Sequence, residues 1–196
     1  MKKKCALILA AGFSTRYGED KRLSGSKPLL DQILQKVCAC FETVYVVHRA
    51  YDPDLLTYIK AYDVIGIAAP IADISLGTSI SVGIEYIQKK NNISVCAIFL
   101  ADMPYISMQS IIKLNIASHE KAIVRPIYQD ISGHPVLFGK AFFPELLDLK
   151  GKNGAYPVIK NNLHHLILLD LDDAGCICDV DQPEDKEKYE KQFLNC

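Results

Sequence analysis

The sequence predicts an α/β fold: a three-layer α/β/α sandwich built on a mostly parallel, Rossmann-like sheet. Two observations support this class. Short apolar runs, typical of strands buried on both faces, alternate along the chain with segments whose apolar residues recur at helical spacing. In addition, the segments rich in glycine, hydroxyl or charged side chains follow the strand-like runs. The fold would therefore gather these segments on one edge of the sheet.

Apolar runs bounded by polar or turn residues predict the strands, the one with Gly66 being the weakest. We expect strands over residues 5–10, 43–48, 64–69, 94–100, 122–128, 165–171 and 177–180, with a further apolar run over 136–138. Pro28, Pro53 and Pro183 stand where helices commonly begin. Together with the helical spacing of apolar residues, they predict helices over 28–41, 52–62, 75–89, 107–118, 142–149 and 183–193.

Length and composition limit the class of protein. The chain has 196 residues, the size of one domain, so we expect residues 1–196 to form a single domain. A net charge of −1 argues against a broad nucleic-acid surface. No apolar run approaches the roughly 20 residues that span a bilayer, and the run after the N-terminal lysines is too short for an export signal. Seven cysteines scattered through apolar segments suit a reducing compartment. We therefore expect a cytoplasmic protein that binds neither nucleic acid nor membrane.

The segment after the first strand has the composition of an anion-binding loop. Small residues at Ala10, Ala11 and Gly12 let main-chain N–H groups approach a ligand closely. Hydroxyl donors and cations follow them: Ser14, Thr15, Arg16 and Lys21. The loop is not a P-loop, because G-x-x-x-x-G-K-[ST] is absent, and Phe13 stands where a dinucleotide fingerprint has its second glycine. It suits a triphosphate, with a purely structural turn as the alternative.

Asp102 follows the strand over 94–100, the most strand-like segment of the chain. A carboxylate at the end of a central buried strand is costly without a partner, and this is where α/β sheets place ligand-binding groups. Mg²⁺ would supply the partner, since proteins hold it with one or two carboxylates plus phosphate oxygens. The alternative is a turn or helix-capping aspartate before Pro104.

Three further segments have both a structural and a functional interpretation. Residues 75–83 could cap a helix or contact a nucleobase or ribose. His134 lies in a loop between Gly133 and Pro135. Strand alternation over 177–180 would point Asp179 and Asp181 to the same side. An unligated capping role for Asp181 at the start of the last helix remains the alternative.

The motif Leu9-Ala10-Ala11-Gly12-x-Ser14-x-Arg16-x-Gly18-x-x-Lys21 resembles the nucleotide-binding signature of the MobA-like nucleotidyltransferases. Within that family it most resembles the molybdenum cofactor cytidylyltransferase (MocA-type) branch. Further similar stretches follow in the family's order: 75–83, L-A-D-M-P at 100–104, G-H-P-V-L-F at 133–138 and D-V-D-Q-P-E-D at 179–185. The resemblance implies the fold of the nucleotide-diphospho-sugar transferases and transfer of a nucleotide from an NTP, with release of pyrophosphate.

The resemblance also implies roles for individual residues. Arg16 and Lys21 would be catalytic. The nucleotide-binding residues would be Leu9, Ala10, Ala11, Gly12, Ser14, Lys21, Gly77, Ser79 and Asp102. The substrate-binding residues would be Gly133, His134 and Tyr156. Asp102 and Asp181 would hold Mg²⁺, with Asp179 as the alternative second ligand.

The form L-A-A-G at residues 9–12 favours CTP as donor, where related guanylyltransferases commonly have L-A-G-G. The resemblance implies a molybdopterin-type cofactor as acceptor and suggests a molybdoenzyme, or its chaperone, as a partner that receives the product. The chain departs from the family's L-x-G-D-x-G-A-R, because Lys152 replaces the acidic residue and Tyr156 the arginine. A sugar or alcohol phosphate is therefore an alternative acceptor.

Two other classes of function compete with the transferase. A non-catalytic carrier of nucleotide or cofactor would not need Arg16, Lys21 and Asp102 together. A Rossmann dehydrogenase would need further fingerprint glycines and an acidic residue after the second strand, where His48 stands.

Overall fold

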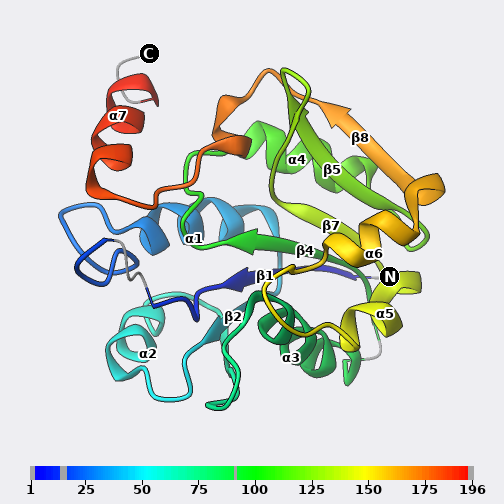
Figure 1. The fold of residues 1–196 in the computed structure, drawn as a ribbon, viewed down its shortest axis with the longest axis horizontal. Helices are drawn as coiled ribbons and strands as arrows, with labels where there is room; N and C mark the ends of the chain where they lie inside the picture. Colours follow the sequence, from blue (N-terminus) through cyan, green and yellow to red (C-terminus); the bar gives the residue numbers. More distant parts are fainter. Residues whose placement is uncertain (1–2, 14–16, 91, 194–196) are drawn as a thin grey trace.

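The computed structural model describes residues 3–13, 17–90 and 92–193. An eight-stranded sheet forms its centre, with strands in the order β3-β2-β1-β4-β7-β5-β6, and β8 also pairs with β5 (Figure 1). The strands are β1 (Lys3–Leu9), β2 (Val44–His48), β3 (Ile65–Ala68), β4 (Ile93–Leu100), β5 (Ile123–Tyr128), β6 (Ile131–Ser132), β7 (Val136–Gly139) and β8 (Leu166–Asp170). The predicted α/β class is confirmed.

Helices flank the sheet (Figure 1). The α-helices are α1 (Leu29–Cys40), α2 (Pro53–Ile59), α3 (Leu76–Gln88), α4 (Met108–Ala117), α5 (Phe143–Leu147), α6 (Tyr156–Asn161) and α7 (Pro183–Phe193). Short 3₁₀ helices cover Lys140–Phe142, Leu163–His165 and Ala174–Ile177. Local sequence explains where two of the long helices begin. The Ser75 and Ser107 side chains cap α3 and α4 by accepting hydrogen bonds from the Thr78 and Ser110 amides.

The sheet is mostly, but not fully, parallel. β1 pairs in parallel with β2 and with β4, β2 pairs in parallel with β3, and so does β5 with β8. β7 breaks the pattern by running antiparallel to both β4 and β5. Because β1, β2 and β4 are parallel neighbours, their carboxyl ends meet at one edge, on the side of Figure 1 where α7 lies.

Strand alternation divides the core into two apolar layers. Along β1, Ala6 and Ile8 pack with α1, α2 and α4 on one face of the sheet. Cys5, Leu7 and Leu9 pack with α3, α5 and α6 on the other face. Both layers contain fully buried side chains, so β1 is covered on both faces as its continuous apolar run predicts.

Two predicted elements differ from the structure. Residues 177–180 do not form a strand: Ala174–Ile177 is a 3₁₀ helix, and the chain then continues without a ladder partner. The Asp173 carboxylate explains the turn, because it accepts hydrogen bonds from the Gly175 and Ser107 amides. The predicted helix over 142–149 divides into a 3₁₀ turn and the short helix α5.

The sequence did not predict β6 or α6. A two-residue turn joins β5 to β6, with both Gln129 and Asp130 at positive φ, and neither residue is glycine. In α6, Tyr156 comes first and Pro157 follows, which suits the first turn of a helix. Among the described residues, no helix is long and apolar enough to cross a membrane.

We expect Gly175→Ala to destabilise the fold. A Cβ at this position would lie 2.3 Å from the Tyr105 carbonyl oxygen, a backbone atom that cannot move aside as a flexible side chain could. Overpacking of this kind costs about 1–3 kcal/mol, and each kcal/mol lowers the melting temperature of a protein of this size by about 2–4 °C. Thermal unfolding followed by circular dichroism would measure the change. Ala174→Ser, at the half-buried neighbouring position, is the control, and an unchanged midpoint for Gly175→Ala would contradict the close packing.

Candidate active site

A lysine and two carboxylates meet at the carboxyl edge of the sheet. The Lys21 Nζ lies 2.9 Å from Asp102 Oδ2 and 3.5 Å from Asp181 Oδ1, and it donates a 2.7 Å hydrogen bond to the Val180 carbonyl. Asp102 follows β4, Lys21 lies in the turn region after β1, and Asp181 lies two residues before α7. The structure therefore brings together three of the predicted site residues from widely separated parts of the chain.

Backbone hydrogen bonds hold the Asp181 segment in place. The Val180 amide donates to the Asp102 carbonyl at 2.9 Å, which joins the chain before α7 to the end of β4. One oxygen of the Asp185 side chain accepts hydrogen bonds from the Asp181 and Gln182 amides. Asp185, which sequence reasoning did not single out, thus fixes the turn that presents Asp181.

The chemistry of this cluster fits a divalent cation. Two carboxylates approach a single ammonium, so they already converge on one point of positive charge. The Asp102 and Asp181 side chains are 29% and 40% exposed, which leaves room for a ligand from solvent. Within the described residues, no group of three or more His, Cys, Asp or Glu side chains could hold a metal. Two carboxylates completed by phosphate oxygens would suit Mg²⁺ better than a metal that needs a full protein cage.

A cavity of about 270 Å³ lies beside Asp102, between the ends of β1 and β4 and the start of α3. It is lined by Leu9, Ala11, Gly12, Ile74, Leu76, Ser79, Leu100 and Asp102. Five of these are predicted nucleotide contacts: Leu9, Ala11, Gly12, Ser79 and Asp102. Ile74, Leu76 and Leu100 were not predicted, because an apolar residue at the start of a helix or the end of a strand gives no signal of ligand binding.

Ala10 and Gly77 are not among the lining residues. Ala10 is buried with the α1 layer, on the opposite face of β1 from Leu9 and Ala11. The Gly77 amide donates to the Gly151 carbonyl at 2.8 Å, and a Cβ at Gly77 would lie 2.8 Å from the Lys150 carbonyl. Gly77 thus lets α3 pack closely against this loop. Ser14 and Arg16, predicted to bind nucleotide and to be catalytic, lie outside the described residues.

His134 is half-buried, and its environment favours the neutral imidazole. Burial, followed by the positive charge of Arg125, lowers the pKa of His134 from 6.5 to about 4, although the Asp102 charge opposes the shift. The His134 amide donates to the Cys176 carbonyl at 2.8 Å, and the His134–Pro135 peptide is cis. A Cβ at Gly133 would lie 2.3 Å from the same carbonyl oxygen. Gly133 and His134 therefore pack against the segment that leads to Asp181.

The family follows from a match over most of the chain. Residues 6–166 match the family model described as the MobA-like NTP transferase domain. The chain belongs to this family. A search of curated proteins finds no match. Family membership makes the chain a nucleotidyltransferase by class. Lys21 and Asp102 belong to the matched residues, and Asp181 lies in the segment that follows them, before α7.

Solved structures share the fold over almost the whole MobA-like chain. Rv0371c from Mycobacterium tuberculosis is 21% identical, with a TM-score of 0.78 and coverage of 97% of this chain and 98% of its own. A second Rv0371c structure, a complex with manganese, is 19% identical, with a TM-score of 0.74 and coverage of 95% and 97%.

Two further solved structures also share the fold. The nucleotidyl transferase Mth528 from a Methanothermobacter species is 14% identical, with a TM-score of 0.83 and coverage of 100% and 99%. The 4-diphosphocytidyl-2C-methyl-D-erythritol synthase from Anaerococcus prevotii is 16% identical, with a TM-score of 0.77 and coverage of 100% and 97%. At these identities the likeness shows the fold alone.

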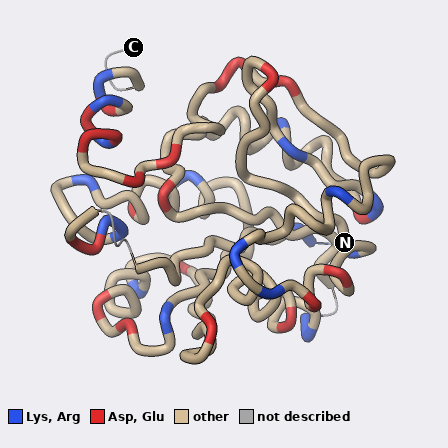
Figure 2. Tube along the Cα trace, in the orientation of Figure 1, with Lys and Arg blue, Asp and Glu red and all other residues tan. Residues whose placement is uncertain are grey.

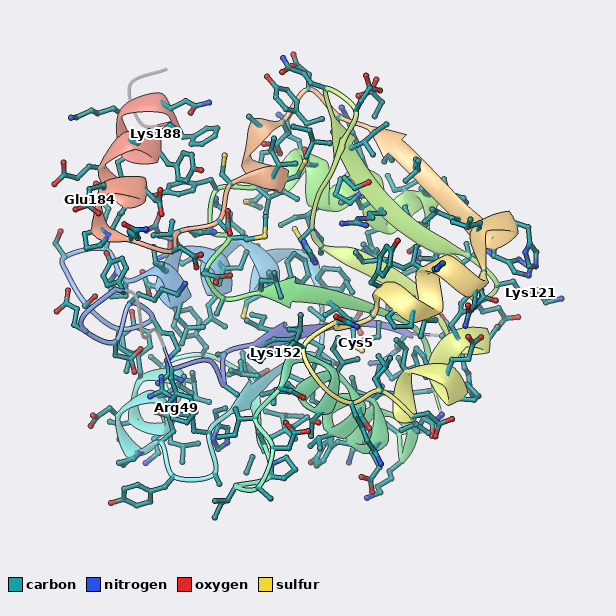
Figure 3. All side chains as sticks on the ribbon, viewed as in Figure 1. Cys5, Arg49, Lys121, Lys152, Glu184 and Lys188 are labelled. Carbon is teal, nitrogen blue, oxygen red and sulfur yellow. The ribbon has the colours of Figure 1, made fainter. Side chains whose placement is uncertain are left out.

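The two residues that depart from the usual MobA-like pattern do not line the cavity beside Asp102. Lys152 lines a second cavity of about 480 Å³, together with Phe13, Ile71, Ala72, Asp73, Ile74, Ser75 and Leu76. The two cavities share Ile74 and Leu76 and are therefore adjacent. Figure 3 labels Lys152 on the loop between α5 and α6. Tyr156, predicted to bind substrate, is 61% exposed at the start of α6 and lines neither cavity.

Sequence reasoning missed several charged residues around the MobA-like site. Arg22 is only 3% exposed, and its guanidinium contacts Asp20 and Asp52. Arg125 donates a 3.0 Å hydrogen bond to the Gly133 carbonyl behind His134. Figure 2 shows that charged residues are spread along the whole chain, and that several of them lie in α7. No periodicity or motif marks these residues, because Asp52 is distant in sequence from Arg22 and the partner of Arg125 belongs to the backbone.

The lowered pKa of His134 predicts a specific pH dependence. The folded-state pKa of about 4 lies below the ordinary 6.5, so the unfolded state takes up a proton that the folded state does not. The free energy of unfolding should therefore fall as the pH decreases from about 6.5 to about 4. His134→Gln should remove this part of the loss, as measured by urea unfolding at several pH values. An imidazole NMR titration of His134 with its midpoint near 6.5 would contradict the prediction.

Proposed function

We propose that the protein transfers a nucleotide from an NTP to the phosphate of a small-molecule acceptor and releases pyrophosphate. The proposed NTP is CTP. The observation that carries the proposal is the convergence of Lys21, Asp102 and Asp181 beside the cavity lined by Ala11 and Gly12. A lysine between two carboxylates, next to a glycine loop, suits a triphosphate that binds together with a divalent cation.

The proposed mechanism relies on position and charge. The acceptor's phosphate oxygen attacks the α-phosphorus of the NTP, the bond to pyrophosphate breaks, and pyrophosphate leaves with its electron pair. Because that oxygen is already ionised at neutral pH, no residue has to remove a proton from it. Lys21, the loop amides and, by resemblance, Arg16 stabilise the negative charge that builds on the transferring and leaving groups.

Asp102 and Asp181 would hold Mg²⁺, which when bound offsets the negative charge of the phosphates and orients them. Their approach to one cationic point supports this assignment. Asp181 lies 3.5 Å from the Lys21 ammonium, whereas Asp179 is exposed, so we prefer Asp181 as the second ligand. A manganese complex of the similar protein Rv0371c also favours a divalent cation.

The donor and acceptor are proposed from the resemblance. L-A-A-G at residues 9–12 favours CTP, and among similar structures the 4-diphosphocytidyl-2C-methyl-D-erythritol synthases have names that refer to a cytidyl product. We propose molybdopterin or the molybdenum cofactor as acceptor and a cytoplasmic molybdoenzyme, or its chaperone, as recipient. A sugar or alcohol phosphate is the second candidate acceptor, because Lys152 and Tyr156 replace the usual acidic residue and arginine. Residues 1–196 would act as one domain.

Pyrophosphate release tests the proposal directly. Each of the four NTPs would be combined with Mg²⁺ and with molybdenum cofactor or a panel of sugar and alcohol phosphates. Release with CTP and molybdenum cofactor alone is the expected result. Release only with another acceptor would retain the chemistry and change the substrate. No release with any pair, despite measurable NTP binding, would contradict the transferase and favour a carrier.

We expect Asp102→Asn to lower kcat by about 100-fold or more, because it removes a charged ligand that supports the reacting phosphates. The fold should persist, since the Asp102 carbonyl that accepts from Val180 is unchanged. Steady-state kinetics would measure the loss. Asp181→Asn should behave in the same way, whereas the matched control Asp179→Asn should retain activity. Near wild-type turnover by Asp102→Asn would contradict the assignment.

Lys152→Asp combined with Tyr156→Arg restores the residues usual in the family. We expect this double variant to change the relative kcat/KM for different acceptors by about tenfold or more, the value of one charged contact. The KM for the NTP should stay nearly constant, because neither side chain lines the cavity beside Asp102. Acceptor competition assays would measure the change. A shift in NTP preference instead would show that these residues act on the donor.

A further inference from the structure

Arg22 uses every donor of its guanidinium inside the protein. Its Nε and Nη2 donate to the two oxygens of Asp20 at 2.7 and 2.5 Å. Nη1 and Nη2 donate to the two oxygens of Asp52 at 2.6 and 3.1 Å. The remaining donor of Nη1 bonds the Ala10 carbonyl at 2.5 Å. One buried side chain thus ties the end of β1 to the Asp20 turn and to the residue that precedes α2.

A second arginine holds the same loop two residues later. Arg49 Nη2 donates to the Gly12 carbonyl at 2.6 Å, and Nη1 lies 3.4 Å from Asp20 Oδ2. Its guanidinium lies over the Phe13 ring, 4.9 Å from the centroid. Figure 3 labels Arg49 beside α2, on the side of the sheet edge where β2 ends. Arg22 and Arg49 therefore hold alternate carbonyls of the loop from one side.

The contact between Arg22 and the Ala10 carbonyl determines the direction of the next amide, that of Ala11. The Leu9 carbonyl accepts from the Ala101 amide on the β4 side, whereas the Ala10 amide donates to Val47 on the β2 side. Arg22 holds the Ala10 carbonyl on the side of Asp52, which follows β2. In a trans peptide the N–H points opposite to the C=O. The Ala11 N–H therefore points towards the β4 side, where Asp102 lines the cavity.

The same reasoning applies to the next held peptide. Because Arg49 fixes the Gly12 carbonyl, the Phe13 N–H points away from Arg49. Within the described residues, the Ala11, Gly12 and Phe13 amides donate no hydrogen bond. Main-chain N–H groups that are aimed to one side and lack internal acceptors are the groups that bind an anion.

We propose that Arg22 and Arg49 are positioning residues that turn the loop amides towards the phosphates of the donor, without contacting the donor themselves. This inference rests on the proposed nucleotidyl transfer. The two carboxylates of Asp20 and Asp52 balance the two guanidinium charges, so the group adds no net attraction for an anion. Its contribution is the orientation of the Ala10 and Gly12 carbonyls.

Arg22 also fixes the backbone next to Lys21. The Arg22 carbonyl accepts from the Leu30 amide at 3.1 Å, which anchors it to the start of α1. Lys21, the adjacent residue, reaches Asp102 on the β4 side. The planar guanidinium of Arg22 donates to two carboxylates and to the Ala10 carbonyl at once. The ammonium of a lysine lacks this planar arrangement of donors and could not make all of these contacts. Arg22→Lys therefore keeps the charge and removes the geometry.

Two variants and two ligands test the proposal. Calorimetry would measure the Kd of inorganic tripolyphosphate, and kinetics the KM values of CTP and of the acceptor, all with Mg²⁺ present. For Arg22→Lys and for the less buried Arg49→Ala, we expect about a tenfold rise in the tripolyphosphate Kd and the CTP KM, the value of one hydrogen bond to a charged group. The acceptor KM should change by less than about twofold, because neither arginine is proposed to act on the acceptor.

Lys4→Met is the matched structural control. Lys4 is a partly buried cation at the opposite end of β1, and its Nζ donates to the Asn115 and Ser118 carbonyls. Lys4→Met should lower the melting temperature yet leave the tripolyphosphate Kd unchanged. If Arg49→Ala and Arg22→Lys bind tripolyphosphate as tightly as the wild type, the positioning role is wrong.

The outcomes separate this inference from the proposed function. Wild-type binding of tripolyphosphate that is weakened in both arginine variants, with no NTP turnover, would support the positioning role and contradict nucleotidyl transfer. Wild-type protein that binds neither tripolyphosphate nor NTP would overturn both. An equal rise in the tripolyphosphate Kd of Lys4→Met would show general destabilisation, and it would overturn the positioning role alone.

Discussion

The hydrogen bond from the Val180 amide to the Asp102 carbonyl joins the last part of the chain to the end of β4, and the candidate site depends on it. Residues 177–180 have no ladder to hold them, so this bond and the Lys21 contact to the Val180 carbonyl set where Asp181 lies. The Asp173 turn and the close approach of Gly175 to Tyr105 deliver the segment to that position. The close packing of Gly175 against Tyr105 thus helps to determine the position of Asp181.

Charge balance distinguishes two neighbouring clusters. Lys21 meets two carboxylates, so its cluster carries a net negative charge, and phosphates could approach it only together with a further cation. Arg22 and Arg49 meet Asp20 and Asp52, and their cluster is neutral. Burial raises the pKa of Asp20, but hydrogen bonds and charge from Arg22 outweigh it, and the pKa is lowered overall. One cluster is suited to a charged ligand and the other to holding the backbone.

The sequence predicted what local patterns determine. Alternation and strand ends placed Asp102, Ala11 and Gly12 on one edge, because parallel strands carry their following loops to the same side. It could not predict contacts between residues far apart in the chain. Lys21 and Asp102 are 81 positions apart, and Arg22 and Asp52 are 30 apart. The strand expected over 177–180 was wrong because alternating apolar residues can also line a 3₁₀ turn and an extended segment.

The surroundings of the two adjacent cavities differ in a way that bears on substrate choice. The cavity beside Asp102 is built on the ends of β1 and β4 and on α3, whose side chains belong to the core. The cavity beside Lys152 is lined mainly by residues 71–76, where Ile71 is 84% exposed and the backbone forms no strand. Changes in exposed loops cost little stability, whereas changes in packed elements cost more. A substitution such as Lys152 can therefore alter what binds at the rim while the phosphate-binding edge keeps its geometry.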